Sequence, residues 1–179
     1  MEHLLLEQLL LKARGVRLMI FDVDGVLTDG RLYYTDAGEE IKAFSTLDGH
    51  GIKMLMASGV GTAILTGRSS KVVTHRARNL GIPHVLQGID DKRSAFLGLA
   101  ASLALSAADC GYMGDDVVDL PVLTRCGFAA TTRESPEIVR RHSHFVAAQP
   151  AGRGAVREVC EALMRAQGTL DAALAPYLA

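Results

Sequence analysis

The segment from Leu18 to Asp29 restricts the possible folds of this chain more than any other part of the sequence. Four apolar residues, Leu18 to Phe21, are followed directly by Asp22 and Asp24. An uninterrupted apolar run of this length is typical of a strand that is buried on both faces of a parallel sheet. Ligands of such sheets bind where the strands end, at their carboxyl edge. We therefore expect Asp22 and Asp24 at a ligand-binding edge, on the same side of the extended chain.

The spacing of these two acids also indicates a metal ion. Two carboxylates so close together repel each other unless a positive charge lies between them, and Mg2+ is a hard cation that prefers oxygen ligands. A single Asp-Gly after a strand is more often a helix cap or a turn, and Gly25 does allow a sharp turn here. That simpler interpretation does not explain two acids at the end of an apolar strand. The pair favours a Mg2+ site.

The composition excludes several classes of protein. The chain has 179 residues, of which 49% are hydrophobic, enough for one domain with a sizeable core. A net charge of −1, 5% aromatic residues and no Trp give no sign of a nucleic-acid partner. The apolar runs are too short for a membrane partner, and the first residues carry acids where a signal peptide carries positive charge. Three widely spaced cysteines fit neither a disulfide scaffold nor a metal site. We expect a cytoplasmic protein.

Strand and helix patterns alternate along the chain. The expected strands are about 17–21, 62–68, 84–87, 110–113, 127–130 and 144–146, and the expected helices about 4–13, 51–58, 70–80, 90–105, 117–125, from 135, and 152–167. Ser45 and Asp48 stand in capping-box register at the start of one helix. This alternation predicts an α/β fold, a Rossmann-like parallel sheet with helices on both faces. We expect a single domain over residues 1–179, without a cap domain, and a flexible tail over about 168–179.

Residues 31–44 carry the signal of a β-hairpin. Two segments of alternating residues flank a turn that contains glycine. Apolar surface would come from Leu32, Tyr34, Ile41 and Phe44. Because an isolated hairpin is only marginally stable, this one must pack against something. The sequence leaves two possibilities open: packing on its own domain, or an interface between subunits.

Polar residues follow the strands at four places that a doubly wound sheet would bring to one edge. They are Asp22 with Asp24, Thr66, Lys92 at a helix start, and Asp115 with Asp116 and Asp119. The set contains no Ser-His or Cys-His pair of the hydrolase kind. The candidate nucleophile is therefore a carboxylate, as in aspartyl-phosphate chemistry.

Each of these residues has a role that suits phosphoryl transfer. Mg2+ would join Asp22, the substrate phosphate and an acid of the turn that contains Asp115. Thr66 and Lys92 would stabilise charge on the phosphoryl oxygens. Asp24 would protonate the leaving alkoxide and later take a proton from the attacking water.

The sequence also resembles a known superfamily. The segments Phe-Asp-Val-Asp-Gly-Val-Leu-Thr, Leu-Thr-Gly-Arg, Asp-Lys and Gly-Asp-Asp-x-x-Asp are similar, in order, to the four motifs of the haloacid dehalogenase superfamily. The resemblance implies Asp22 as nucleophile, Asp24 as general acid/base, and Thr66 and Lys92 as phosphate-binding residues. It implies Mg2+ ligation by Asp22, Asp115 and the backbone carbonyl of Asp24. Asp116 or Asp119 would lie in the outer sphere.

Three further segments, 29–33, 47–51 and 152–160, are similar to the 3-deoxy-D-manno-octulosonate 8-phosphate phosphatases. That family implies Mg2+-dependent hydrolysis of this sugar-acid phosphate in lipopolysaccharide precursor biosynthesis. It also implies a homotetramer in which neighbouring subunits cover the site. The substrate contacts predicted on this basis are Thr66, Gly67, Arg68, Lys71, Lys92 and Arg153. Ser69 stands where many members have an acid or Lys, so this chain departs from the pattern beside Arg68.

Three other functions remain open from the sequence. The first is the same chemistry on a nine-carbon sugar-acid 9-phosphate. The second is a non-catalytic oligomerisation module, although the intact acids and lysine of the four motifs count against it. The third is a phosphotransferase or mutase, which is disfavoured because the gaps between the motifs are too short for a cap domain.

Overall fold

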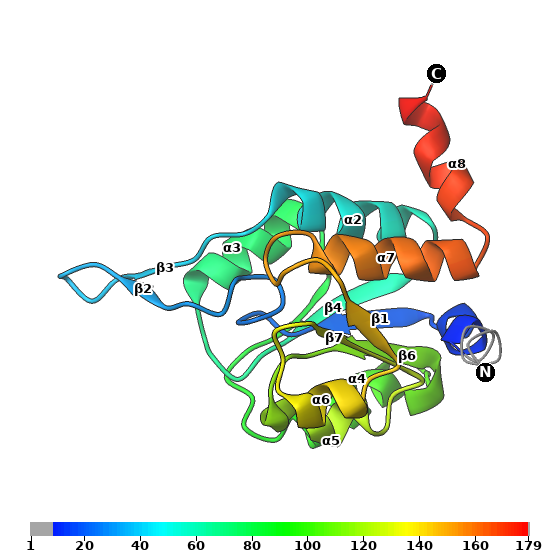
Figure 1. The fold of residues 1–179 in the computed structure, drawn as a ribbon. Helices are drawn as coiled ribbons and strands as arrows, with labels where there is room; N and C mark the ends of the chain where they lie inside the picture. Colours follow the sequence, from blue (N-terminus) through cyan, green and yellow to red (C-terminus); the bar gives the residue numbers. More distant parts are fainter. Residues whose placement is uncertain (1–8, 179) are drawn as a thin grey trace.

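The structure, a computed structural model, describes residues 9–178 and contains a six-stranded parallel sheet (Figure 1). The strand order is β5-β4-β1-β6-β7-β8, and every neighbouring pair is parallel. The strands are β1 (Leu18–Phe21), β4 (Gly61–Leu65), β5 (His84–Leu86), β6 (Cys110–Met113), β7 (Phe128–Thr132) and β8 (Phe145–Ala147). The predicted α/β Rossmann-like architecture is confirmed.

Helices cover both faces of the sheet. Figure 1 shows α2 (Thr46–Ala57), α3 (Lys71–Leu80) and α7 (Ala155–Ala166) on one face. The other face carries α4 (Lys92–Ser102), α5 (Leu120–Leu123) and α6 (Glu137–Arg141). None of the helices within residues 9–178 has the length and apolar character needed to cross a bilayer.

Strand β1 lies at the centre of the sheet because it is apolar on both sides. Met19 and Phe21 belong to the core beneath α2, α3 and α7. Leu18 and Ile20 belong to the core beneath α4, α5 and α6. All four side chains are buried, as expected for an apolar run in a parallel sheet. The central position of β1 puts the residues that follow it in the middle of the carboxyl edge.

The predicted hairpin is present and projects from the body of the molecule (Figure 1). Its strands are β2 (Tyr33–Tyr34) and β3 (Glu40–Ile41), paired antiparallel. Four large side chains on it are exposed: Leu32, Tyr33, Tyr34 and Ile41. Phe44 instead packs against the core, with the Arg76 guanidinium 5.7 Å from its ring centre. The domain therefore covers the base of the hairpin and leaves its strands exposed.

Helix α2 begins directly after Ser45, whose hydroxyl accepts from the Asp48 amide, as the predicted helix start at Ser45 requires, although the sequence predicts the body of the helix only from about Gly51. Glycines disfavour a helix interior, but here two of them allow neighbours to approach. A Cβ atom on Gly49 would lie 2.2 Å from Nη2 of Arg76, and one on Gly51 would lie 3.0 Å from Cα of Arg157. Close packing of α2 against α3 and α7 explains why the helix extends through both glycines.

Other element boundaries differ by a few residues. The predicted helix over 117–125 is a 3-10 turn over Val117–Asp119 followed by α5. The C-terminal segment contains α8 (Leu170–Leu174) and a 3-10 turn; it projects beyond α7 in Figure 1 and contacts α2, where the Tyr177 and His50 ring centres lie 5.4 Å apart. Residues 9–14 are helical, and the earlier part of the predicted N-terminal helix lies outside the described residues.

Candidate active site

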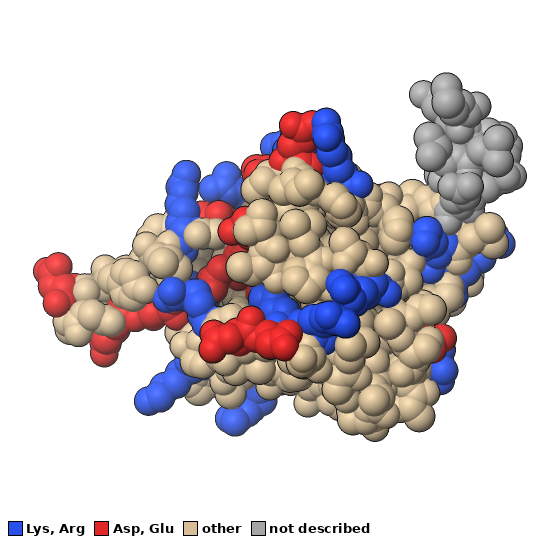
Figure 2. All heavy atoms as spheres, turned by 90° about the horizontal axis from the view of Figure 1, so that it is seen from below, with Lys and Arg blue, Asp and Glu red and all other residues tan. Residues whose placement is uncertain are grey.

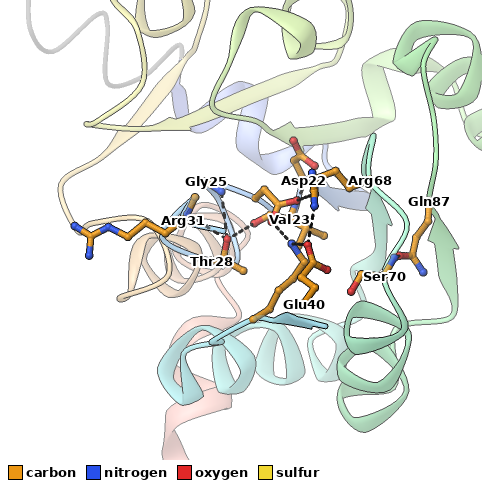
Figure 3. Close-up of polar contacts among 12 residues, drawn as sticks. Asp22, Val23, Gly25, Thr28, Arg31, Glu40, Arg68, Ser70 and Gln87 are labelled. Atoms are coloured by element: carbon orange, nitrogen blue, oxygen red, sulfur yellow. Dashed lines mark hydrogen bonds and ion pairs between the residues drawn. The ribbon is translucent and has the colours of Figure 1, made fainter. Parts of the chain in front are cut away.

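The loop after β1 is held by a network of backbone and side-chain hydrogen bonds. The Asp22 amide donates to the Met113 carbonyl (2.9 Å), and the Val23 amide donates to Asp22 Oδ1 (2.7 Å). The Thr28 hydroxyl accepts from the Gly25 amide (3.4 Å) and donates to the Val23 carbonyl (3.4 Å), as Figure 3 shows. Gly25 has φ +85°, a conformation that glycine adopts without steric cost. These bonds fix the carboxylate of Asp22 at the strand end.

A pocket of about 290 Å³ lies at this edge of the sheet. It is lined by Asp22, Asp24, Gly30, Thr66, Gly67, Arg68, Lys92, Asp115, Asp116 and Val118. These residues come from the loops after β1, β4 and β6 and from the first residue of α4. The structure thus brings together all five residues for which the sequence predicts catalytic or metal-binding roles.

Lys92 is a buried cation that lines the pocket. Its Nζ donates to Asp22 Oδ2 (2.7 Å) and to Asp119 Oδ1 (2.6 Å). Burial disfavours the charged form of Lys92, but the carboxylates of Asp22 and Asp119 outweigh burial and raise its pKa. The ammonium therefore stays charged beside Asp22, the nucleophile candidate.

Asp119 holds the other groups in place. It is fully buried, and its Oδ1 accepts from Lys92 and from the Tyr112 hydroxyl (2.6 Å). Its Oδ2 accepts from the backbone amides of Asp115 (3.0 Å) and Asp116 (3.1 Å). A carboxylate has about four acceptor positions, and all four are occupied here. Asp119 therefore anchors Lys92 and the turn after β6, with no free lone pair for a metal ion.

The charges of the pocket fit a divalent cation. Oxygen atoms of Asp22, Asp115 and Asp119 lie within 4.8 Å of one another, so three carboxylates face the single ammonium of Lys92. Burial, and then the negative charge of Asp119, raise the pKa of Asp22 to about 6 and that of Asp115 to about 7. Two negative charges remain uncompensated. Asp119 contributes charge but no free lone pair, so the carboxylate oxygens of Asp22 and Asp115 are the donors open to a metal ion, and hard oxygen donors are those that Mg2+ prefers.

Asp24 has a partner that sequence reasoning missed. Its Oδ1 accepts a hydrogen bond from Lys42, and its Oδ2 lies 3.7 Å from Nε of Arg68. Glu40 pairs with both cations. It lies 3.3 Å from Lys42 Nζ, and 2.8 Å from Arg68 Nη2 as Figure 3 shows. The only sequence signal is that Glu40 and Lys42, two residues apart in an extended segment, share one face.

The chain is similar in sequence to known phosphatases. No protein-family model matches the chain. It is 43% identical over 162 residues to the 3-deoxy-D-manno-octulosonate 8-phosphate phosphatase KdsC of Escherichia coli K12, covering 90% of this chain and 86% of that protein. The chain belongs to the 3-deoxy-D-manno-octulosonate 8-phosphate phosphatase family.

Solved structures agree with this family. The phosphatase of the same name from Moraxella catarrhalis, in complex with magnesium, phosphate and KDO, superposes with a TM-score of 0.94 at 42% identity, covering 96% of this chain and 98% of that one. A HAD superfamily (subfamily III A) hydrolase from Legionella pneumophila gives 0.95 at 38% identity, with 99% and 97% coverage. The resemblance to the haloacid dehalogenase superfamily is confirmed.

The three basic residues that the family resemblance suggests as sugar contacts do not all lie in the same pocket. Arg68 lines the pocket, with its side chain 45% exposed. Arg153 lines a neighbouring cavity of about 420 Å³, which shares Gly30, Asp115 and Asp116 with the pocket. Lys71 is exposed at the start of α3. In the face seen in Figure 2, acidic and basic side chains are interspersed towards the hairpin end.

Gly25→Ala is expected to raise the half-saturating Mg2+ concentration of this phosphatase by roughly 10–100-fold, the usual range when a metal-site support is lost. A Cβ atom at this position would lie 2.0 Å from Oδ2 of Asp115, so the carboxylate must move. A Mg2+ titration of phosphate release measures the effect. Gly38→Ala is the matched control, because Gly38 has a similar φ of +79° but no atom within 4 Å of the added Cβ. Equal effects of both variants would show that backbone strain alone is responsible.

Proposed function

We propose that this chain is a Mg2+-dependent phosphatase that hydrolyses 3-deoxy-D-manno-octulosonate 8-phosphate to the free sugar acid and phosphate. The observation that carries the proposal is the buried Asp22 carboxylate, bonded to Lys92 at 2.7 Å within an acidic pocket, in a chain 43% identical to KdsC. The Moraxella catarrhalis complex with magnesium, phosphate and KDO supports both the metal and the class of product.

In the first half of the reaction, Asp22 attacks the phosphorus atom. A bond forms from a carboxylate oxygen of Asp22 to phosphorus while the bond from phosphorus to the sugar oxygen breaks, which leaves an aspartyl phosphate. Asp24 gives its proton to the departing alkoxide. Thr66 and Lys92, in the pocket wall, stabilise the charge on the phosphoryl oxygens. Mg2+ held by Asp22, Asp115 and the Asp24 carbonyl supplies positive charge that lets a phosphate dianion approach a carboxylate.

In the second half, water releases the phosphate. Asp24, now ionised, takes a proton from the attacking water. The oxygen of that water forms a bond to phosphorus, and the bond from phosphorus to Asp22 breaks. Inorganic phosphate leaves, the carboxylate of Asp22 is free again, and Asp24 is again protonated. Atoms and protons balance over the cycle without any redox partner.

Phosphate release from a panel of esters tests the substrate. The panel contains the eight-carbon and nine-carbon sugar-acid phosphates and an aryl phosphate, each with Mg2+ and with EDTA. We expect kcat/KM for the eight-carbon ester to exceed that for the nine-carbon ester at least about tenfold, a difference of 1.4 kcal/mol. Faster hydrolysis of the nine-carbon ester would assign the chain to that substrate instead. If no ester releases phosphate, the chain would instead be a non-catalytic oligomerisation module.

The state of assembly is part of the same proposal. We propose one uncapped domain that assembles through the hairpin into a homotetramer, where neighbours close the pocket. The exposed side chains of Leu32, Tyr33, Tyr34 and Ile41 support this, because such clusters mark interaction sites. A cytoplasmic location is also proposed, supported by three buried free cysteines, which suit a reducing compartment.

Without metal, the protein is expected to be less stable at pH 8 than at pH 5. The raised pKa values of Asp22 (about 6) and Asp115 (about 7) mean that the folded state retains protons which the unfolded chain, near 3.8, has lost. Stability therefore falls as the pH rises between about 4 and 7. Thermal unfolding in EDTA measures it.

Added Mg2+ should restore stability at pH 8. At a concentration about 100 times its dissociation constant, the gain is about 2.7 kcal/mol. A chain of this size then melts roughly 5–10 °C higher. Asp115→Asn should reduce both the pH dependence and the response to Mg2+, because it removes one of the repelling carboxylates. A metal-free protein whose stability rises towards pH 8 would contradict the charge balance derived for the pocket.

A further inference from the structure

Lys42 is buried in an unusual place for a lysine. It follows β3 of the exposed hairpin, yet only 1% of its side chain is accessible. Lysines are almost never fully buried unless they are paired. The partners of its ammonium are two carboxylates, those of Asp24 and Glu40. Burial of a charge is costly, so the position of Lys42 is determined by the acids around it.

The two oxygens of Asp24 are in different environments because of Lys42. Oδ1 accepts a hydrogen bond from the ammonium of Lys42. Oδ2 lies 3.7 Å from Nε of Arg68, too far for a hydrogen bond. One oxygen is thus occupied, whereas within residues 9–178 no hydrogen bond is made to the other, and Asp24 lines the pocket. Such an arrangement fixes the rotation of the carboxylate and leaves Oδ2 to exchange a proton.

A second layer of contacts keeps Lys42 in place. Glu40 lies 3.3 Å from the ammonium and also accepts from Nη2 of Arg68 at 2.8 Å. Arg68 in turn donates to the Tyr34 hydroxyl at 2.8 Å. Burial acts against ionisation of Glu40, but hydrogen bonds from Arg68 and Lys42 outweigh it and lower its pKa to about 2. Both strands of the hairpin are therefore connected to Asp24 through ionised groups.

We propose that Lys42 is the positioning residue for Asp24: it holds Oδ1, so that Oδ2 meets the leaving oxygen of the substrate and, afterwards, the attacking water. This inference rests on the proposed phosphatase function and adds to it a residue from outside the four motifs. Lys42 does not touch the substrate. It acts through the orientation of the carboxylate that moves the proton.

The chemistry of the leaving group separates this role from a structural one. A sugar alkoxide needs a proton when its bond to phosphorus breaks, whereas a nitrophenolate is stable without one. Loss of Lys42 should therefore slow the first half of the reaction for the sugar ester and leave it almost unchanged for the nitrophenyl ester. The second half, in which Asp24 activates water, should slow for both. With the nitrophenyl ester the variant should show a burst of nitrophenolate before a slow steady state.

The test is a double-mutant cycle with Lys42→Met and Asp24→Asn. Asp24→Asn is expected to lower kcat about 10²–10⁴-fold, the usual range for a lost general acid/base. Lys42→Met should lower kcat about 10–100-fold with little change in KM. In the Asp24→Asn background, Lys42→Met should have almost no further effect, because it acts only through Asp24. Multiplicative losses in the double variant would overturn the proposal.

Two further variants control for folding. Lys53→Met removes an exposed lysine of α2 and should leave turnover unchanged. Glu40→Gln weakens the second layer of contacts but leaves the buried Lys42 in place, so it is the variant to use if Lys42→Met does not fold. We expect it to lower kcat less than Lys42→Met does, and to have no effect on kcat in the Asp24→Asn background. A loss of kcat that persists in that background overturns the role of Lys42. Because the cycle runs on the nitrophenyl ester, it stays valid whichever sugar acid the wild-type enzyme prefers.

Discussion

Asp22→Asn is expected to lower phosphate release by about 10⁴-fold or more, the scale seen when a nucleophilic group is removed. The amide keeps the shape of the side chain but cannot form the acyl phosphate. The fold should survive, because Lys92 keeps its 2.6 Å bond to Asp119 and the Val23 amide still meets an oxygen acceptor. Thermal unfolding with and without Mg2+ checks that the variant is folded.

A trapping experiment identifies the covalent step directly. Wild-type enzyme quenched in acid during turnover of a labelled phosphate ester should carry one labelled phosphoryl group, and Asp22→Asn should carry none. Asp36→Asn, at the exposed turn of the hairpin, is the control and should behave as wild type. Near-normal phosphate release from pure Asp22→Asn would show that water attacks the ester directly, and the aspartyl-phosphate mechanism would be wrong.

The parts of the site that the sequence predicts are those that depend on local pattern. The apolar run Leu18–Phe21 is buried on both faces, as its uninterrupted apolar pattern predicts, whereas its central place in the sheet is known only from the structure. Parallel strands end at one edge, and this geometry explains why Asp22, Thr66 and Asp115 line one pocket although they are far apart in sequence.

The features that sequence reasoning missed depend on distant contacts. Asp48 has the register of a capping box, but its carboxylate accepts from the backbone amides of Gly154 (3.2 Å) and Arg157 (2.9 Å), which begin α7. Lys42 looks like a surface residue of a hairpin until the hairpin is placed over Asp24. Local spacing cannot reveal such partners, because they are set by how separate elements pack.

The last prediction concerns the hairpin as the assembly surface. Leu32→Asp combined with Ile41→Asp is expected to split the proposed oligomer into monomers. The two side chains are 47% and 54% exposed and make no polar contact with the pocket, whereas Tyr34 bonds to Arg68 and is less suitable. Burying unpaired carboxylates in an interface costs several kcal/mol. Light scattering measures the mass in solution, and Leu11→Asp, on another exposed apolar residue, is the control.

Activity measured on the same samples then tests whether neighbours complete the pocket. The monomer keeps the four motifs, so hydrolysis of a small aryl phosphate should change little. Hydrolysis of the sugar-acid phosphate should fall at least about tenfold, because contacts worth 1.4 kcal/mol or more would be lost with the neighbouring subunit. A monomer with full activity on the sugar acid would mean that one subunit holds the complete site. An oligomer unchanged by both charges would mean that the hairpin is not the interface, and its exposed apolar residues would need another partner.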